Sequence, residues 1–208
     1  MERNQGRMNR GAYVMDDTDY RIVTGIESSQ GLFNEIMDLG DIVYPAEYSG
    51  EIENVAARYK RDPNQAISIV DKNTNKLVGN ITSFPCTDEL YEDVRYNTKI
   101  IRDDDIKPEE IDDYSTKRNN MFIISVAIHP DYRDGKAIKI LMHAWIDYLN
   151  ELECKGYPIT TISGIVISED GKKIAKRHMM VEERVLDDGN TLMICEGENL
   201  KKLLSHDF

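Results

Sequence analysis

A short turn between a predicted strand and a predicted helix carries residues that can hold a phosphate. The turn begins at His129 in the stretch HPDYRDGKAIKIL, and it places Arg133 and Gly135 directly before the helix. Because the first turn of a helix has unpaired N–H groups and a partial positive charge, it attracts anions. Arg133 adds a permanent cation, and Gly135 lets a ligand approach the backbone closely. The turn therefore predicts a site for a phosphate-bearing ligand; the alternative is a plain strand–turn–helix unit without a ligand.

The elements that position this turn follow from the hydrophobic pattern around it. Residues 119–128 (NNMFIISVAI) are rich in β-branched and aromatic side chains and predict a buried strand that ends at His129. Beyond the turn, apolar residues recur every three or four positions, which predicts an amphipathic helix ended by Gly156. Trp145 lies on the apolar face of that helix, so we expect it in the core.

The same stretch resembles the signature of the GNAT family of N-acetyltransferases. In that family a strand ends in V-x-P-x-Y-R, and an Arg/Gln-x-x-Gly-x-Gly/Ala loop holds the pyrophosphate of coenzyme A. With Arg133 in the first loop position, Lys136 and Ile138 stand where the family has glycines, and Gly135 and Ala137 are each displaced by one. The resemblance implies that acetyl-CoA is the co-substrate. It places the diphosphate over the loop residues Arg133, Asp134, Gly135, Lys136, Ala137 and Ile138.

The resemblance also implies an α+β fold with a mixed, mostly antiparallel central sheet flanked by helices. Its fourth and fifth strands splay apart, and the pantetheine arm pairs with the fourth strand at Val126, Ala127 and Ile128, where a backbone N–H polarises the thioester carbonyl. The order of predicted elements fits this fold from about residue 20 to residue 197. The other predicted strands are 20–25, 65–71 and 76–84 (a hairpin), 158–168, and 191–195 after the turn at Asp188–Asn190. The other predicted helices are about 32–39 (capped by Ser28 or Ser29 and ended by Gly40), 51–60 and 172–178.

The family's usual acid, a tyrosine on the helix after the fifth strand, is absent from this sequence. Registering Met179 and Met180 on the family's Gly-Phe pair places Ser168 where the family has an Asn that accompanies the cofactor, and Ala175 at the tyrosine. His178 on the same predicted helix is a substitute acid, because its ring titrates near neutral pH. The alternative is a structural histidine.

The loop between the first two predicted helices offers groups for an amine acceptor, and the resemblance places the acceptor pocket beside this loop. Asp41 and Glu47 are carboxylates that can hold an ammonium group, and Glu47 can take its proton directly or through water. Tyr44 and Tyr48 can wall the pocket, and Tyr44 is a second candidate for the acid. The alternative is the ordinary polarity of a surface loop.

One segment departs from the family pattern, in which a short turn joins the third and fourth strands. Residues 86–118 intervene here, and eleven of them are Asp or Glu. Short helices are predicted at 89–95 and 108–114. The charge is typical of a solvated insertion; the functional alternative is a lid or an interaction surface that recruits a cationic substrate.

Composition limits the remaining choices. The 208 residues fit one domain (19–208) preceded by a polar tail (1–18), and the alternative for the tail is an arm that contacts a second subunit, as in a homodimer. A net charge of −12 disfavours nucleic acid as a partner. The sequence has no apolar run of the kind that a membrane span or a signal peptide needs, and its three cysteines (Cys86, Cys154 and Cys195) lie far apart. We therefore expect a cytoplasmic protein without disulfides or a metal site.

Together these observations predict an N-acetyltransferase that moves an acetyl group from acetyl-CoA directly to a primary amine of a small molecule or a basic peptide. A covalent route needs an activated nucleophile, and none of the cysteines has a recognisable partner motif. The alternative keeps the fold without the catalysis: an inactive acyl-CoA-binding or protein-interaction module.

Overall fold

The computed structural model describes residues 19–25, 30–97 and 101–207 of the chain. Within these residues the strands form one seven-stranded sheet in the order β1-β2-β3-β4-β5-β7-β6. Every neighbouring pair is antiparallel except β4 and β5, which run parallel. The sheet confirms the predicted fold class. Its strands are β1 (Tyr20–Thr24), β2 (Ala66–Asp71), β3 (Leu77–Pro85), β4 (Asn119–Ile128), β5 (Ile159–Val166), β6 (Val181–Val185) and β7 (Thr191–Glu196).

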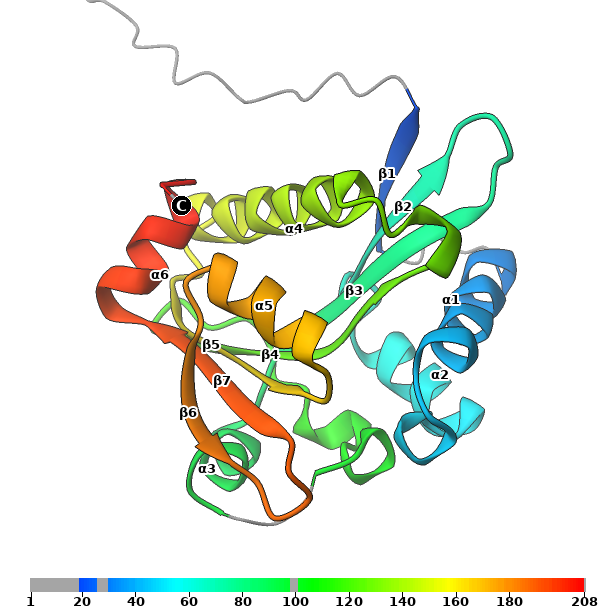
Figure 1. Ribbon diagram of the computed structural model, residues 1–208. Coiled ribbons are helices and arrows are strands. Elements are labelled where there is room, and N and C mark those ends of the chain that lie inside the picture. Colours follow the sequence, from blue (N-terminus) through cyan, green and yellow to red (C-terminus); the bar gives the residue numbers. More distant parts are fainter. Residues whose placement is uncertain (1–18, 26–29, 98–100, 208) are drawn as a thin grey trace, which may run out of the picture.

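Helices cover both faces of this sheet (Figure 1). They are α1 (Gln30–Val43), α2 (Ile52–Arg61), α3 (Asp88–Tyr96), α4 (Lys136–Cys154), α5 (Glu169–Arg177) and α6 (Gly197–Leu204), with short 3-10 turns η1 (Ala46–Tyr48), η2 (Asp103–Asp105), η3 (Pro108–Glu110) and η4 (Pro130–Tyr132). On one face α1 and α2 bury Phe33 and Tyr59 against Ala66. On the other face α4 buries Trp145, which is 1% exposed and whose indole N–H donates to Ser83 Oγ at 2.8 Å. Trp145 is therefore a core residue, as predicted.

β4 and β5 separate part of the way along their length. Their pairing begins at Asn119 and Ile159 and ends at Ile123 and Gly164. β4 continues beyond this point beside β3, and the register between Thr82 and Ser83 shifts by one residue, which leaves Ile124 as a β-bulge. The bulge bends β4 away from β5. The predicted splay is confirmed, and it opens a gap in the middle of the sheet.

The end of α1 and the start of α5 differ from the predicted boundaries by about three residues or more. α1 runs through Gly40 to Val43, and the Tyr44 N–H donates to the Gly40 carbonyl at 2.8 Å; the helix ends there because the residue before a proline avoids the helical conformation. α5 starts earlier than predicted because Ser168 caps it, its Oγ accepting the Gly171 N–H at 3.1 Å. The predicted tail 1–18 and the predicted caps Ser28 and Ser29 lie outside the described residues.

Two further elements were not predicted. β6 (VEERV) is an edge strand with three charged residues at its centre, and it therefore lacks the alternation of apolar residues that identifies a strand. α6 has only two turns, too few to show a period, although Leu200 and Leu203 are buried in the cluster that contains α4.

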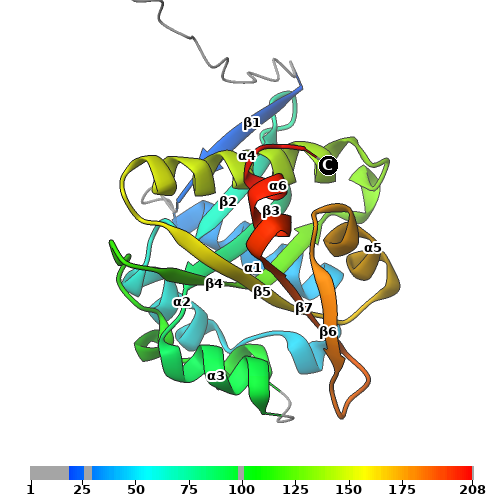
Figure 2. The same ribbon diagram turned by 90° about the vertical axis from the view of Figure 1, so that its left-hand side faces the viewer.

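The part of residues 86–118 that the structure describes is solvated on its acidic side and also has a buried apolar side. α3 forms as predicted, with the Thr87 hydroxyl accepting the Leu90 N–H, whereas the predicted helix 108–114 is reduced to η3. Most of the acidic side chains face outward, whereas Asp103 turns inward to Arg58. Figure 2 shows α3 beneath the sheet. Apolar side chains of the insertion are buried there and pack with Phe84 and Leu192; they are Leu90, Val94, Ile106 and Ile111. Arg95 fastens α3 to β7 by two hydrogen bonds to Glu196, of 2.8 and 2.9 Å. The insertion is thus part of the core.

Among the described residues, no helix combines the length and the apolar character needed to cross a membrane.

Candidate active site

The gap between β4 and β5 opens into a cavity of about 240 Å³. The lining residues come from both faces of the sheet, since Leu39 and Tyr59 belong to the α1–α2 face and Met142 and Trp145 to the α4 face. The cavity therefore passes through the sheet where the two strands separate. Ligands that enter from opposite faces can meet at the separated part of β4.

The hydroxyl of Tyr44 forms hydrogen bonds with β4 at the point where β4 has separated from β5. It donates to the Val126 carbonyl at 2.9 Å, and it accepts the Val126 N–H at 3.0 Å and the Ser125 hydroxyl at 3.2 Å. The N–H and C=O of Val126 would pair with β5 if the strands stayed together. The Tyr44 hydroxyl, at the end of α1, pairs with these two groups instead. A ligand with an amide or carbonyl group can pair with them in the same way.

The pKa values of two cavity residues define their protonation at neutral pH. Burial raises the pKa of Tyr44 above its ordinary value of 10.0, although the hydrogen bonds from Ser125 and Val126 lower it, so the hydroxyl keeps its proton. Burial lowers the pKa of His178 below its ordinary value of 6.5, so its ring is neutral at pH 7. His178 Nδ1 lies 2.8 Å from the Ile174 carbonyl, an arrangement that places the ring proton on Nδ1. Tyr44 is therefore the better proton donor of the two.

The turn before α4 has the backbone geometry of an anion site. Gly135 is the N-cap residue with φ of 90°, a left-handed conformation that favours glycine. Arg133 ends η4, and its Nε donates to the Ile128 carbonyl at 3.2 Å, which fixes the guanidinium beside the end of β4. The positive end of α4 and this cation lie at one side of the gap.

Two side chains of the same turn reduce its attraction for anions. Asp134 Oδ1 accepts the Lys136 N–H at 2.9 Å and so occupies one amide of the first helical turn. The Lys136 ammonium pairs with Asp19 at 2.8 Å and lies over the Tyr20 ring, so its charge is directed towards β1. The site therefore depends on Arg133 and on the remaining helix N–H groups.

A buried ion pair borders the cavity on the α1–α2 face. Arg58 of α2, with a side chain only 3% exposed, binds the Asp103 carboxylate, the Asp103 carbonyl at 2.6 Å and the Ile106 carbonyl at 3.0 Å. Burial raises the pKa of Asp103, although the Arg58 guanidinium opposes this rise. Gly50 packs so closely against Asp103 that a side chain at residue 50 would collide with the carboxylate. The insertion thus contributes a carboxylate to the cavity wall.

The structure brings together some of the predicted site residues. Those that line the cavity are Asp41, Tyr44, Tyr48, Val126, Ala127, Ser168 and His178. Glu47 is exposed in η1 and is not among the lining residues, and neither are Ile128 and the turn residues Arg133, Asp134, Gly135, Lys136, Ala137 and Ile138. Arg58, Asp103 and Ser125 were not predicted. Arg58 and Asp103 are 45 positions apart, and no local pattern joins them.

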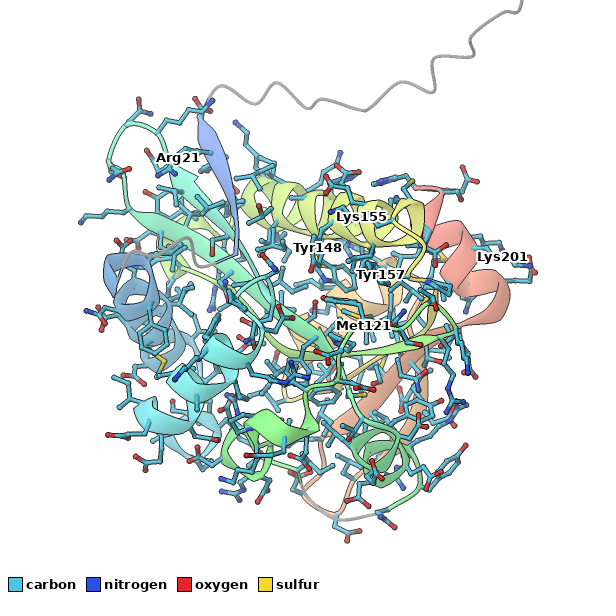
Figure 3. All side chains as sticks on the ribbon, turned by 180° about the vertical axis from the view of Figure 1, so that it is seen from behind. Arg21, Met121, Tyr148, Lys155, Tyr157 and Lys201 are labelled. Atoms are coloured by element: carbon cyan, nitrogen blue, oxygen red, sulfur yellow. The ribbon has the colours of Figure 1, made fainter. Side chains whose placement is uncertain are left out.

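A second, separate cavity of about 500 Å³ lies on the rear of the molecule. Its lining includes Tyr114, Tyr148 and Tyr157, and the hydroxyls of Tyr114 and Tyr148 lie 2.9 Å apart. Figure 3 shows Tyr148 and Tyr157 near Lys155 at the C-terminal part of α4. These tyrosines do not line the cavity at the β4–β5 gap.

Comparison with known proteins identifies the fold and the family. The model of the acetyltransferase (GNAT) family matches residues 33–163. No curated protein sequence matches the chain. The loading GNATL domain of CurA from Lyngbya majuscula superposes with a TM-score of 0.62 at 12% identity, covering 90% of this chain and 98% of that chain.

Two other solved structures have the same fold. A chain of the NatC complex bound to Gag peptide and CoA gives a TM-score of 0.60 at 14% identity, covering 86% of this chain and 99% of that chain. A mosquito arylalkylamine N-acetyltransferase-like 5b gives 0.56 at 11% identity, covering 86% of this chain and all of that one. At such identities these likenesses concern the fold alone. The family model, however, spans more than half of the sequence, so the chain belongs to the GNAT acetyltransferase family.

Proposed function

We propose that this chain is an N-acetyltransferase that moves an acetyl group from acetyl-CoA to a primary amine by direct attack. Membership of the GNAT family indicates acyl-CoA-dependent acyl transfer, and the acetyl group and the amine are the finer parts of the proposal. The observation that carries the proposal is Val126. Its N–H and C=O face the cavity at the β4–β5 gap, where an acyl-pantetheine arm can take the hydrogen bonds that Tyr44 now makes.

In the proposed reaction the Val126 N–H donates to the thioester carbonyl oxygen and stabilises the negative charge that develops there. The amine nitrogen attacks the carbonyl carbon, a C–N bond forms, and the C–S bond breaks. Tyr44 gives its proton to the departing thiolate. The attacking nitrogen loses a proton as the amide forms, and this proton returns to Tyr44 through water. Tyr44 suits this role because its hydroxyl reaches Val126 and keeps its proton at neutral pH.

The coenzyme's diphosphate is proposed to lie at the N-terminus of α4 beside Arg133. Replacing Arg133 with alanine is expected to weaken acetyl-CoA binding about tenfold, because a charge-assisted contact to phosphate is lost while the helix N–H groups remain. Calorimetric titration measures this change. Arg21→Ala is the matched control, since Arg21 is exposed on β1 (Figure 3). Its guanidinium donates to Asn75 Oδ1 at 3.2 Å. Equal affinity in both variants would remove the turn from the proposed site.

The pH dependence of turnover distinguishes Tyr44 from His178 as the acid. If Tyr44 donates the proton, turnover is expected to rise with pH as the amine loses its proton and not to fall up to about pH 10, because the raised pKa keeps the Tyr44 hydroxyl protonated. If His178 were the acid, turnover would fall as the pH rises through its lowered pKa, below 6.5. We expect no fall in turnover between pH 7 and about pH 10, and we expect His178→Gln to leave the profile unchanged. A fall with rising pH that this variant abolishes would contradict the assignment.

The alternative, binding without catalysis, is favoured by one observation. Ala175 lines the cavity at the position where the resemblance places the family's acid. Incubation with acetyl-CoA labelled in the acetyl group and a panel of primary amines tests both possibilities. Labelled N-acetyl amine, formed faster than without protein, supports the transferase. Tight acetyl-CoA binding without transfer to any amine would support the inactive module.

A further inference from the structure

Tyr48 is held between two segments that lie far from it in the sequence. Its hydroxyl accepts a hydrogen bond from Asn190 Nδ2 at 2.8 Å, in the turn between β6 and β7. The Arg102 guanidinium of the insertion lies over its ring, 5.8 Å from the centroid, and also reaches the Glu47 carbonyl at 3.4 Å. We call these three residues, Tyr48, Arg102 and Asn190, the Tyr48 clasp. The clasp joins the α1–α2 loop, the insertion and the β6–β7 turn.

The clasp closes over the α1–α2 half of the cavity, since Tyr48 and Arg102 both line it. Neighbouring parts of the insertion are fixed in the same way. Asp104 accepts the Glu51 N–H at 2.8 Å, and Asn54 donates to the Ile106 carbonyl at 3.1 Å. Together with the buried Arg58–Asp103 pair, these bonds hold the insertion against α2. Several contacts therefore fix the insertion as a wall of the cavity.

The space under the clasp has an apolar wall and carboxylates. The apolar residues on this side are Ile36, Met37, Leu39, Val55, Ile101 and Ile106. Asp41 lies exposed at the end of α1, and Asp103 is close enough to Tyr44 to raise its pKa. A primary ammonium group can therefore approach Asp103 near the Tyr44 hydroxyl, with an apolar body against the wall.

We infer that the acceptor is a small primary amine with an apolar body, and that the Tyr48 clasp selects it against peptides. A peptide presents backbone N–H and C=O groups along its length, and these lose their hydration against a wall that is mostly apolar. The chain that follows its first residue would also have to pass between the three segments that the clasp joins. A small amine has no peptide groups to desolvate, and no chain follows it that would have to pass between these segments.

This inference rests on the proposed acetyl transfer, and its test compares two acceptors in one assay. The acceptors are 2-phenylethylamine and a peptide of about ten residues that begins with phenylalanine and has a free α-amino group. The full chain is expected to acetylate the amine with a kcat/KM at least about 100-fold higher than the peptide. The variant Arg102→Ala/Asn190→Ala is expected to narrow this ratio about tenfold, because it removes a hydrogen bond and a cation–π contact from the clasp.

Arg61→Ala is the control for this variant. Arg61 also joins α2 to the insertion, through Asp113 at 2.7 Å, but neither residue lines the cavity. For Arg61→Ala, the ratio of kcat/KM for the amine to kcat/KM for the peptide is expected to equal that of the unmodified chain. A peptide acetylated as well as the amine by the unmodified chain, or a ratio that the double variant leaves unchanged, would overturn the clasp while leaving acetyl transfer standing. Transfer to neither acceptor, by a protein that binds acetyl-CoA, would overturn both.

Discussion

Replacing Tyr44 with phenylalanine is expected to lower the rate of acetyl transfer about 100-fold and to strengthen acetyl-CoA binding at the same time. The rate falls because the proposed proton donor is removed. Binding strengthens because the hydroxyl no longer competes for the N–H and C=O of Val126, and each such hydrogen bond contributes about 1 kcal/mol. For the two bonds together, this amounts to roughly thirtyfold in the dissociation constant.

Opposite changes in turnover and affinity distinguish this role from a structural one. Single-turnover kinetics and calorimetric titration measure the two quantities separately. Tyr148→Phe is the matched control, because it also removes a half-buried hydroxyl that has a hydrogen-bond partner, Tyr114, in the rear cavity. The control is expected to change neither quantity. A Tyr44→Phe protein with normal turnover, or with weaker acetyl-CoA binding, would contradict the proposed role of the hydroxyl.

Replacing Asp103 with alanine is expected to lower the free energy of unfolding by about 3 kcal/mol. The change leaves the Arg58 guanidinium buried without its carboxylate, and a buried unpaired charge is strongly unfavourable. The pKa of Asp103 is raised by burial in spite of Arg58, which indicates that desolvation opposes the pair. Removing one partner is therefore expected to destabilise the chain far more than replacing both partners by apolar residues.

Denaturant unfolding of Asp103→Ala beside Asp113→Ala tests the placement of the insertion. Asp113 lies in the same insertion and pairs with Arg61 of α2, but the Asp113 side chain is 86% exposed. The loss of such a pair seldom changes stability measurably. We expect a clear shift of the midpoint for Asp103→Ala and none for Asp113→Ala. Equal, small effects would mean that residues 101–106 are not packed on α2 in solution.

The elements nearest the proposed cofactor site were predictable because each carries a local pattern. β4 is a continuous run of strand-forming residues, and α4 shows a helical period that ends near Gly156. The splay of β4 from β5 came from the resemblance to the GNAT family, and the pairing confirms it. The end of α1 was misplaced at Gly40 because a glycine inside a helix looks like a stop, although Pro45 is the residue that ends it.

The contacts that form the α1–α2 half of the cavity, where the acceptor is proposed to bind, could not be predicted because they join distant positions. Tyr44 and Val126 are 82 positions apart, and Tyr48 and Asn190 are 142 apart. The hydrogen-bonding groups of Val126 belong to the main chain, so no side-chain pattern indicates them. Asp103 lies in a run of three aspartates, and only its contact with Arg58 distinguishes it from its neighbours. The sequence indicated the type of chemistry but not the arrangement of these groups.

Calorimetric titration with acetyl-CoA, beside desulfo-CoA and ATP, tests the central claim most directly. If the acyl-pantetheine arm pairs with β4 at Val126, acetyl-CoA and desulfo-CoA are expected to bind in the micromolar range and ATP, which lacks the arm, at least about 100-fold more weakly. This result would show that the pantetheine arm contributes most of the affinity, as pairing with β4 requires. The absence of acetyl-CoA binding, or binding no tighter than that of ATP, would contradict the account.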